Sequence, residues 1–121
     1  MHTQSTILCI DDEELELSLR KMVLEAAGYA VFTATNASKA LEVFRFQCID
    51  LVITNNLQGI TSHSFVAELR HLSPQLPIIV LSGGPTLPAA VAPPDYHLHK
   101  LEGPIEMIAR VQHAIAGSAA S

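Results

Sequence analysis

Five short runs of largely apolar residues, each followed by polar residues or a turn, dominate the hydrophobic pattern of the chain. The runs have the length of strands and are rich in β-branched side chains. Most of them lack alternation of polar and apolar positions, which is typical of strands buried on both faces of a parallel sheet. We therefore predict five strands, at 6–10, 29–34, 51–54, 77–82 and, in a more polar form, 96–99.

Apolar residues at helical spacing follow the strands. In the first such segment, we expect the apolar face of an amphipathic helix to consist of Leu15, Leu19, Met22, Val23 and Ala26. Gly28 follows at a position that favours a left-handed residue and ends this helix. Three further helices are predicted from the apolar sets Ala37, Ala40, Leu41 and Phe44; Phe65, Val66, Leu69 and Leu72; and Ile105, Ile108, Val111 or Gln112, and Ile115.

Strand and helix alternate along almost the whole chain, without repeats or linkers. This alternation predicts an α/β fold with a doubly wound, five-stranded parallel sheet and helices on both faces. The segment 83–95 contains four prolines, so we expect the fourth helix to be short or missing. We expect one domain over 1–121, with an ordered core at about 6–116 and a tail at 117–121.

Polar residues stand where the predicted strands end. Asp11 and Asp12 follow the first strand, Asn55 the third, Ser82 the fourth and Lys100 the fifth. The carboxyl ends of parallel strands lie on one edge of the sheet, where open α/β folds place their sites. We therefore expect two carboxylates, an amide, a hydroxyl and an ammonium group to converge.

Charge and composition argue against several classes of function, among them DNA-binding and membrane-spanning proteins. The formal net charge is -5, and the seven Lys and Arg residues are scattered, which argues against DNA binding by this domain. No apolar run approaches the roughly 20 residues of a membrane span, and the N-terminus does not resemble a signal peptide. Cys9 and Cys48 lack the spacing of a metal site or a disulfide framework, so we expect free thiols and a cytoplasmic protein.

The order and spacing of these residues resemble the receiver domains of bacterial two-component response regulators. The motifs that carry the resemblance lie at 7–13, 50–54 and 77–83 and at Lys100, and together they extend over nearly the full chain. The resemblance implies a flavodoxin-like (βα)5 fold with strand order 2-1-3-4-5. It also implies phosphorelay signalling, in which a histidine kinase transfers a phosphoryl group to an aspartate after the third strand.

The resemblance further implies roles for the residues at the sheet edge. Asp11 and Asp12 would hold Mg²⁺, with Asn55 and the Leu57 carbonyl as further ligands. Ser82 and Lys100 would contact the phosphoryl oxygens. The position of the family's switch aromatic is occupied by His97.

Asn55 occupies the position of the phosphoacceptor carboxylate. A neutral amide does not form an acyl phosphate by this mechanism, and the loss of its negative charge weakens a Mg²⁺ site. The chain also has Leu101 where the family has a proline after its lysine. We therefore expect a degenerate, non-enzymatic receiver (a pseudo-receiver) that binds Mg²⁺ weakly, or not at all, and signals by protein–protein interaction.

The expected partner is a histidine kinase or another signalling protein, without membrane contact, and a homodimer through the face 83–116 is a further expectation. One alternative function is a working phosphorelay receiver with a displaced acceptor at Asp11 or Asp12. Another is a flavodoxin-like nucleotide or flavin binder that uses Ser82, Gly83 and Gly84.

Structural roles remain open for the same residues. The acidic run 11–16 suits a helix N-terminus through the helix dipole. Lys100 suits an ion pair with Asp11 or Asp12, and Ser82 suits a local hydrogen bond. His97 and His99 share one face of the edge strand, as two exposed histidines, as two ligands or as a pH-sensitive pair.

Overall fold

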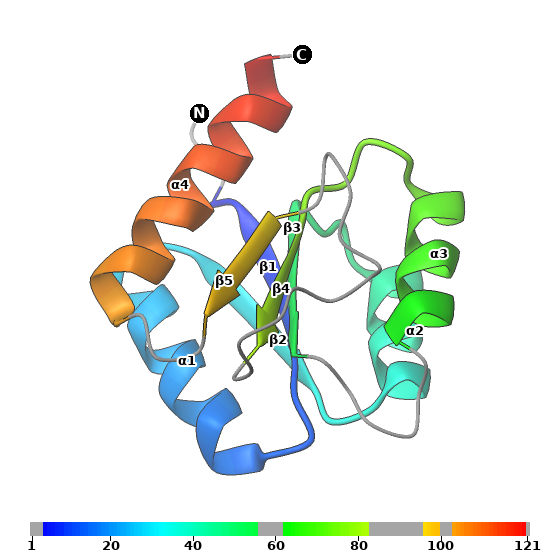
Figure 1. Cartoon of the computed structure of the whole chain (residues 1–121), viewed down its shortest axis with the longest axis horizontal. Coiled ribbons are helices and arrows are strands. Elements are labelled where there is room, and N and C mark those ends of the chain that lie inside the picture. The colour runs from blue at the N-terminus through cyan, green and yellow to red at the C-terminus, as the bar shows by residue number, and fades with distance from the viewer. Residues whose placement is uncertain (1–3, 56–61, 83–95, 100–102, 121) are drawn as a thin grey trace.

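The computed structural model describes residues 4–55, 62–82, 96–99 and 103–120 (Figure 1). Strands and helices alternate along most of this chain, as the hydrophobic pattern predicts. In chain order they are β1 (Thr6–Ile10), α1 (Glu14–Ala26), β2 (Ala30–Ala34), α2 (Ala37–Phe46), β3 (Leu51–Asn55), α3 (Ser62–Leu72), β4 (Ile78–Ser82), β5 (Tyr96–His99) and α4 (Pro104–Ala120).

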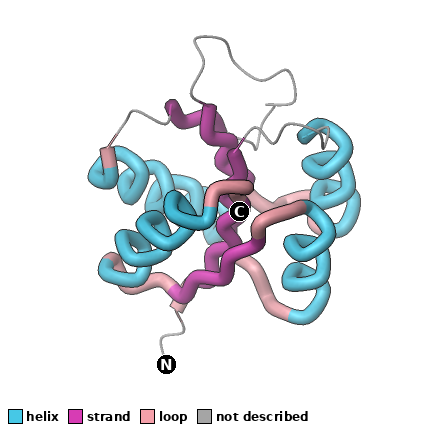
Figure 2. The backbone as a smooth tube through the Cα atoms, turned by 90° about the horizontal axis from the view of Figure 1, so that it is seen from below, coloured by secondary structure: helices cyan, strands magenta, loops and turns pink. Residues whose placement is uncertain are grey.

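The five strands form one parallel sheet in the order β2-β1-β3-β4-β5. This order confirms the predicted doubly wound receiver topology. Helices α1 and α4 cover one face of the sheet, and α2 and α3 cover the other (Figures 1 and 2). The predicted shortening of the fourth helix concerns residues 83–95, which lie outside the described residues.

Two hydrophobic clusters, one on each face of the sheet, make up the core. The first joins alternate strand residues such as Cys9 and Ile53 to α1 and α4. The second joins the intervening strand residues, such as Ile10 and Val52, to α2 and α3. Successive side chains of a strand point to opposite faces, which explains why apolar runs without alternation supply both clusters.

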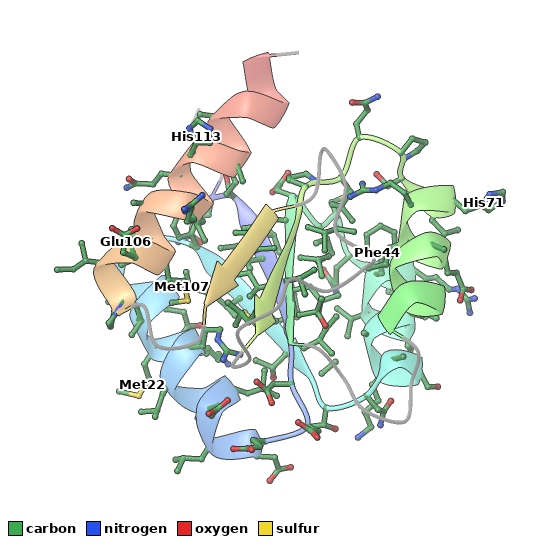
Figure 3. All side chains as sticks on the ribbon, viewed as in Figure 1. Met22, Phe44, His71, Glu106, Met107 and His113 are labelled. Atoms are coloured by element: carbon green, nitrogen blue, oxygen red, sulfur yellow. The ribbon has the colours of Figure 1, made fainter. Side chains whose placement is uncertain are left out.

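The predicted apolar face of α1 is wrong for most of its residues, although Val23 packs against the core as predicted. Leu15, Leu19 and Met22 are 74%, 54% and 66% exposed, whereas Leu17 and Leu24 are buried. Figure 3 shows Met22 on the outer side of α1. Leucines stand on several stripes of this helix, and contact with the sheet selects the stripe through Leu17 and Leu24. Gly28 follows the helix with a φ of 102°, which confirms its predicted left-handed conformation.

Helix α4 differs from the prediction at both ends. Ile105 was expected in its apolar face but is 84% exposed, and Met107 and Ala114 are buried in addition to Val111, whose burial was predicted. Figure 3 shows Met107 on the side of α4 that faces the rest of the domain. The helix continues through Ala120, past Gly117, where the sequence analysis places the start of a tail. Among the described residues, no helix is long and apolar enough to cross a membrane.

Candidate functional site

The carboxyl edge of the sheet brings the ends of several strands together. Ile10 of β1 pairs with Thr54 of β3, so Asp11 and Asn55 stand one position further along adjacent strands. Asn55 pairs with Leu81 of β4, and Ser82 follows Leu81. The backbone therefore places three of the predicted strand-end positions on neighbouring strands.

Asp11 is held at this edge by its backbone and by its side chain. Its N–H donates to the carbonyl of Ala34 at 3.2 Å, which continues the pairing of β1 with β2. One carboxylate oxygen, Oδ1, accepts the backbone N–H of Glu13 at 2.9 Å, just before α1 begins. The residue is fully buried. A buried carboxylate requires charged or hydrogen-bonding partners.

Arg20 is a charged partner of Asp11, and it was not among the predicted site residues. Its Nη1 and Nη2 atoms each donate to Asp11 Oδ2 at 3.4 Å. Nη2 also lies 3.8 Å from Glu16 Oε2, one helical turn away. Arg20 falls on the same stripe of α1 as Leu17 and Leu24, at a spacing of three and four residues. This spacing is the sequence pattern that could have placed Arg20 on the side of the helix facing the sheet.

The two adjacent aspartates occupy different environments. Asp11 is buried and paired with Arg20, whereas Asp12 is exposed. Glu14 and Glu16 lie in the first turn of α1, where negative charge is favoured by the helix dipole. The acidic run therefore contributes both to the start of a helix and to the site.

Cys9 lies in the core just before the acidic pair and is fully buried. Burial raises the pKa of its thiol from 9.0 to about 12; the positive charge of Arg20 opposes this rise and the negative charge of Asp11 adds to it. Cys48 is exposed, and both thiols are free as predicted. A buried thiol with a raised pKa is a poor nucleophile, so Cys9 is a core residue.

Other predicted site residues are only partly described. Leu57 and Lys100 lie outside the described residues. The predicted metal ligand at the Leu57 carbonyl and the predicted ion pair of Lys100 therefore stay predictions. His97 and His99 belong to β5, where they pair with Val80 and Ser82 respectively. Gly83 and Gly84, required for the nucleotide or flavin alternative, also lie outside, as does the 83–95 part of the predicted dimer face.

The described residues do not fit a Mg²⁺ site well. Within the described ranges, no group of three or more His, Cys, Asp or Glu side chains is placed to hold a metal ion. The guanidinium of Arg20 lies against Asp11 Oδ2, and the other oxygen of that carboxylate accepts the Glu13 N–H. Mg²⁺ needs near-octahedral oxygen ligands, and it would be repelled by the adjacent positive charge.

Comparisons with known proteins agree with this architecture. The family described as "Response regulator receiver domain" matches residues 7–112. The response regulator receiver domain protein from Clostridium thermocellum has a crystal structure with a TM-score of 0.85 and 27% identity, and the match covers 95% of this chain and 97% of that one.

Curated relatives share the same segment. Transcriptional regulatory protein GlrR of Escherichia coli is 30% identical over 92 residues, which are 75% of this chain and 21% of that protein. Autoinducer 1 sensor kinase/phosphatase LuxN of Vibrio campbellii is 36% identical over 80 residues, 64% of this chain and 9% of that protein. The chain thus spans about a fifth or less of the length of these relatives.

Proposed function

This chain belongs to the response regulator receiver domain family, and from that premise we propose that it is a signalling module without phosphorylation at the usual position. The observation that carries the proposal is Asn55 at the end of β3, one register position beyond the pair of Ile10 and Thr54. The family's transfer requires a carboxylate at this place, because the acceptor oxygen must attack phosphorus and form an acyl phosphate. Asn55 supplies an amide instead.

The environment of Asp11 argues against its use as a displaced acceptor. Its carboxylate is fully buried, and both of its oxygens already accept hydrogen bonds from Arg20 and Glu13. An attacking carboxylate must instead present a free oxygen in line with the phosphoryl donor. The module therefore acts by binding other proteins rather than by carrying a phosphoryl group at Asp11, and it is not an enzyme.

The relatives indicate the class of partner. LuxN is described as a sensor kinase/phosphatase and GlrR as a transcriptional regulatory protein. We propose a histidine kinase or another signalling protein of a two-component system as the partner, in the cytoplasm. The net charge of -5 supports a protein partner rather than DNA, and a homodimer through the face 83–116 belongs to the same proposal.

The test compares the natural chain with Asn55→Asp. Both proteins are incubated with acetyl phosphate and Mg²⁺ and then weighed intact by mass spectrometry. We expect no phosphoryl adduct on the natural chain. An acid-labile adduct on the natural chain at high occupancy would contradict the proposal, whereas an adduct confined to Asn55→Asp would show that only the nucleophile has been lost.

Asp12 supports a second candidate, a phosphorelay receiver with a displaced acceptor, because it is exposed at the same edge. Phosphopeptide mapping after incubation with a cognate kinase distinguishes the two candidates. A phosphoryl group on Asp12 that disappears in Asp12→Asn would establish the displaced acceptor. Its absence in the natural chain would leave protein binding as the function.

A further inference from the structure

Arg20 places a buried positive charge inside the acidic edge of the sheet. Its side chain is only 10% exposed, although arginine is rarely buried to this extent without a partner. The negative charge that compensates it is Asp11, which is 0% exposed, with Glu16 at the rim of the site 39% exposed. The ion pair is therefore formed between a strand end and the first helix, inside the protein.

The guanidinium of Arg20 contacts the carboxylate oxygen of Asp11 at which a bound cation would compete with it. Asp11 Oδ2 lies 3.4 Å from both terminal nitrogens of Arg20, and Oδ1 accepts the Glu13 N–H. Arginine remains positively charged under all ordinary conditions and presents a rigid fork of donors to a carboxylate. A metal ion at Oδ2 would have to displace it.

We propose that the Arg20 guanidinium is the resident cation of this pocket and replaces the divalent ion of the receiver family. This inference rests on the proposed function, because both concern the same edge of the sheet. Because Asn55 is neutral, this edge has one carboxylate fewer than it would have with the family's acceptor. The pocket therefore has less negative charge to balance, and the single positive charge of Arg20 replaces the two charges of Mg²⁺.

The replacement also fixes the relation between β1 and α1. Arg20 belongs to α1 and Asp11 follows β1, so their ion pair is present whenever the domain is folded. A metal ion, by contrast, binds and leaves with its concentration. The domain therefore holds the junction between β1 and α1 in one state, independent of Mg²⁺, which suits a module that signals by docking alone.

The test measures Mg²⁺ binding without any phosphorylation. Thermal melts of the full chain are recorded across a Mg²⁺ titration, together with one-to-one Mn²⁺ binding followed by electron paramagnetic resonance. We expect the natural chain to shift by less than about 1 °C and to bind no Mn²⁺. Arg20→Leu exposes Asp11 to the ion, and we expect its melting temperature to rise by about 5 °C at a tenfold excess of Mg²⁺ over its Kd.

Two further variants keep the result decisive. Arg110→Leu removes an exposed arginine of α4 and should behave like the natural chain. Arg20→Gln keeps an amide donor for Asp11 and serves if Arg20→Leu does not fold. A Mg²⁺ response in either Arg20 variant supports the inference. It is overturned if the natural chain responds as strongly, or if neither Arg20 variant responds. Phosphorylation of the natural chain would contradict the proposed function. It would not affect the metal-binding measurements that test the present inference, so the two failures can be told apart.

Discussion

Two buried polar residues of the described chain lie on opposite faces of the sheet, and they differ in charge. Among the described residues, Asp11 and Thr54 are the buried polar ones. Asp11 lies on the face of α1, where it contacts Arg20, and Thr54 follows Val52 on the face of α2 and α3. Asp11 directly follows β1, and Thr54 belongs to the adjacent strand β3, one register position before Asp11.

The difference shows what each kind of group demands of its surroundings. A buried threonine hydroxyl needs only one or two hydrogen-bond partners, and the residues around it on the sheet can remain apolar. A buried carboxylate requires a counter-charge. Helix α1 provides this charge with Arg20, on the buried stripe where its other residues are leucines. Asp11 thus requires a specific ion pair with α1, whereas the hydroxyl of Thr54 requires no counter-charge from α2 or α3.

The largest effect is expected from breaking the charged pair. Arg20→Leu removes the guanidinium that contacts the buried Asp11 carboxylate, and we expect the free energy of unfolding at neutral pH to fall by about 3–5 kcal/mol. Urea denaturation in the absence of divalent ions measures this loss. A loss below about 1 kcal/mol would contradict the view that Arg20 compensates Asp11.

The neutral face provides the matched control for that experiment. Thr54→Val removes the buried hydroxyl without leaving a charge, and its cost should stay within about 1.5 kcal/mol. The double variant Asp11→Asn with Arg20→Leu should recover part of the stability that Arg20→Leu loses, because the buried side chain at position 11 no longer carries a charge. Additive losses in the double variant would show that the two residues do not interact.

The packing of α1 offers a second test of the charged face. Leu24 is fully buried and Leu19 is 54% exposed, although both are leucines of one helix. We expect Leu24→Ala to lower the free energy of unfolding by about 2–5 kcal/mol, because it opens a cavity. Leu19→Ala should change it by less than about 0.5 kcal/mol. Urea denaturation measures both values. Equal losses of the free energy of unfolding in the two variants would show that Leu19 belongs to the core.

The smallest effect concerns the thiol behind the ion pair. The pKa of Cys9 is raised from 9.0 to about 12 in the folded chain, so the unfolded chain releases this proton first as the pH rises. The stability it contributes is complete below pH 9 and is lost toward pH 12. Between about pH 8 and pH 10, we expect a loss of about 1 kcal/mol.

Variants of the two cysteines isolate this contribution. Cys9→Ala should show a shallower decline of the free energy of unfolding over this pH range, whereas Cys48→Ala should keep the slope of the natural chain, because Cys48 is exposed. Urea denaturation at several pH values provides the comparison. The same slope in all three proteins would show that Cys9 does not titrate differently in the folded state.

Much of the fold follows from local pattern. Apolar runs such as Thr6–Ile10 and Leu51–Asn55 are strands because buried strands need no alternation, and polar residues such as Asp11 mark where they end. The strand order, implied by the family resemblance, is the one observed. The role of Arg20 escaped prediction because the predicted apolar face of α1 did not include the buried stripe of Leu17 and Leu24 on which Arg20 lies.

The sequence by itself determined the alternation of strands and helices and placed an asparagine where the family has its acceptor carboxylate. Both are local properties, since residue order and side-chain chemistry define them. Only the tertiary structure decided which stripe of α1 is buried and which cation faces Asp11. Those outcomes depend on how a helix with leucines on several sides rotates against the sheet, and on a buried carboxylate that must find its counter-charge nine residues away.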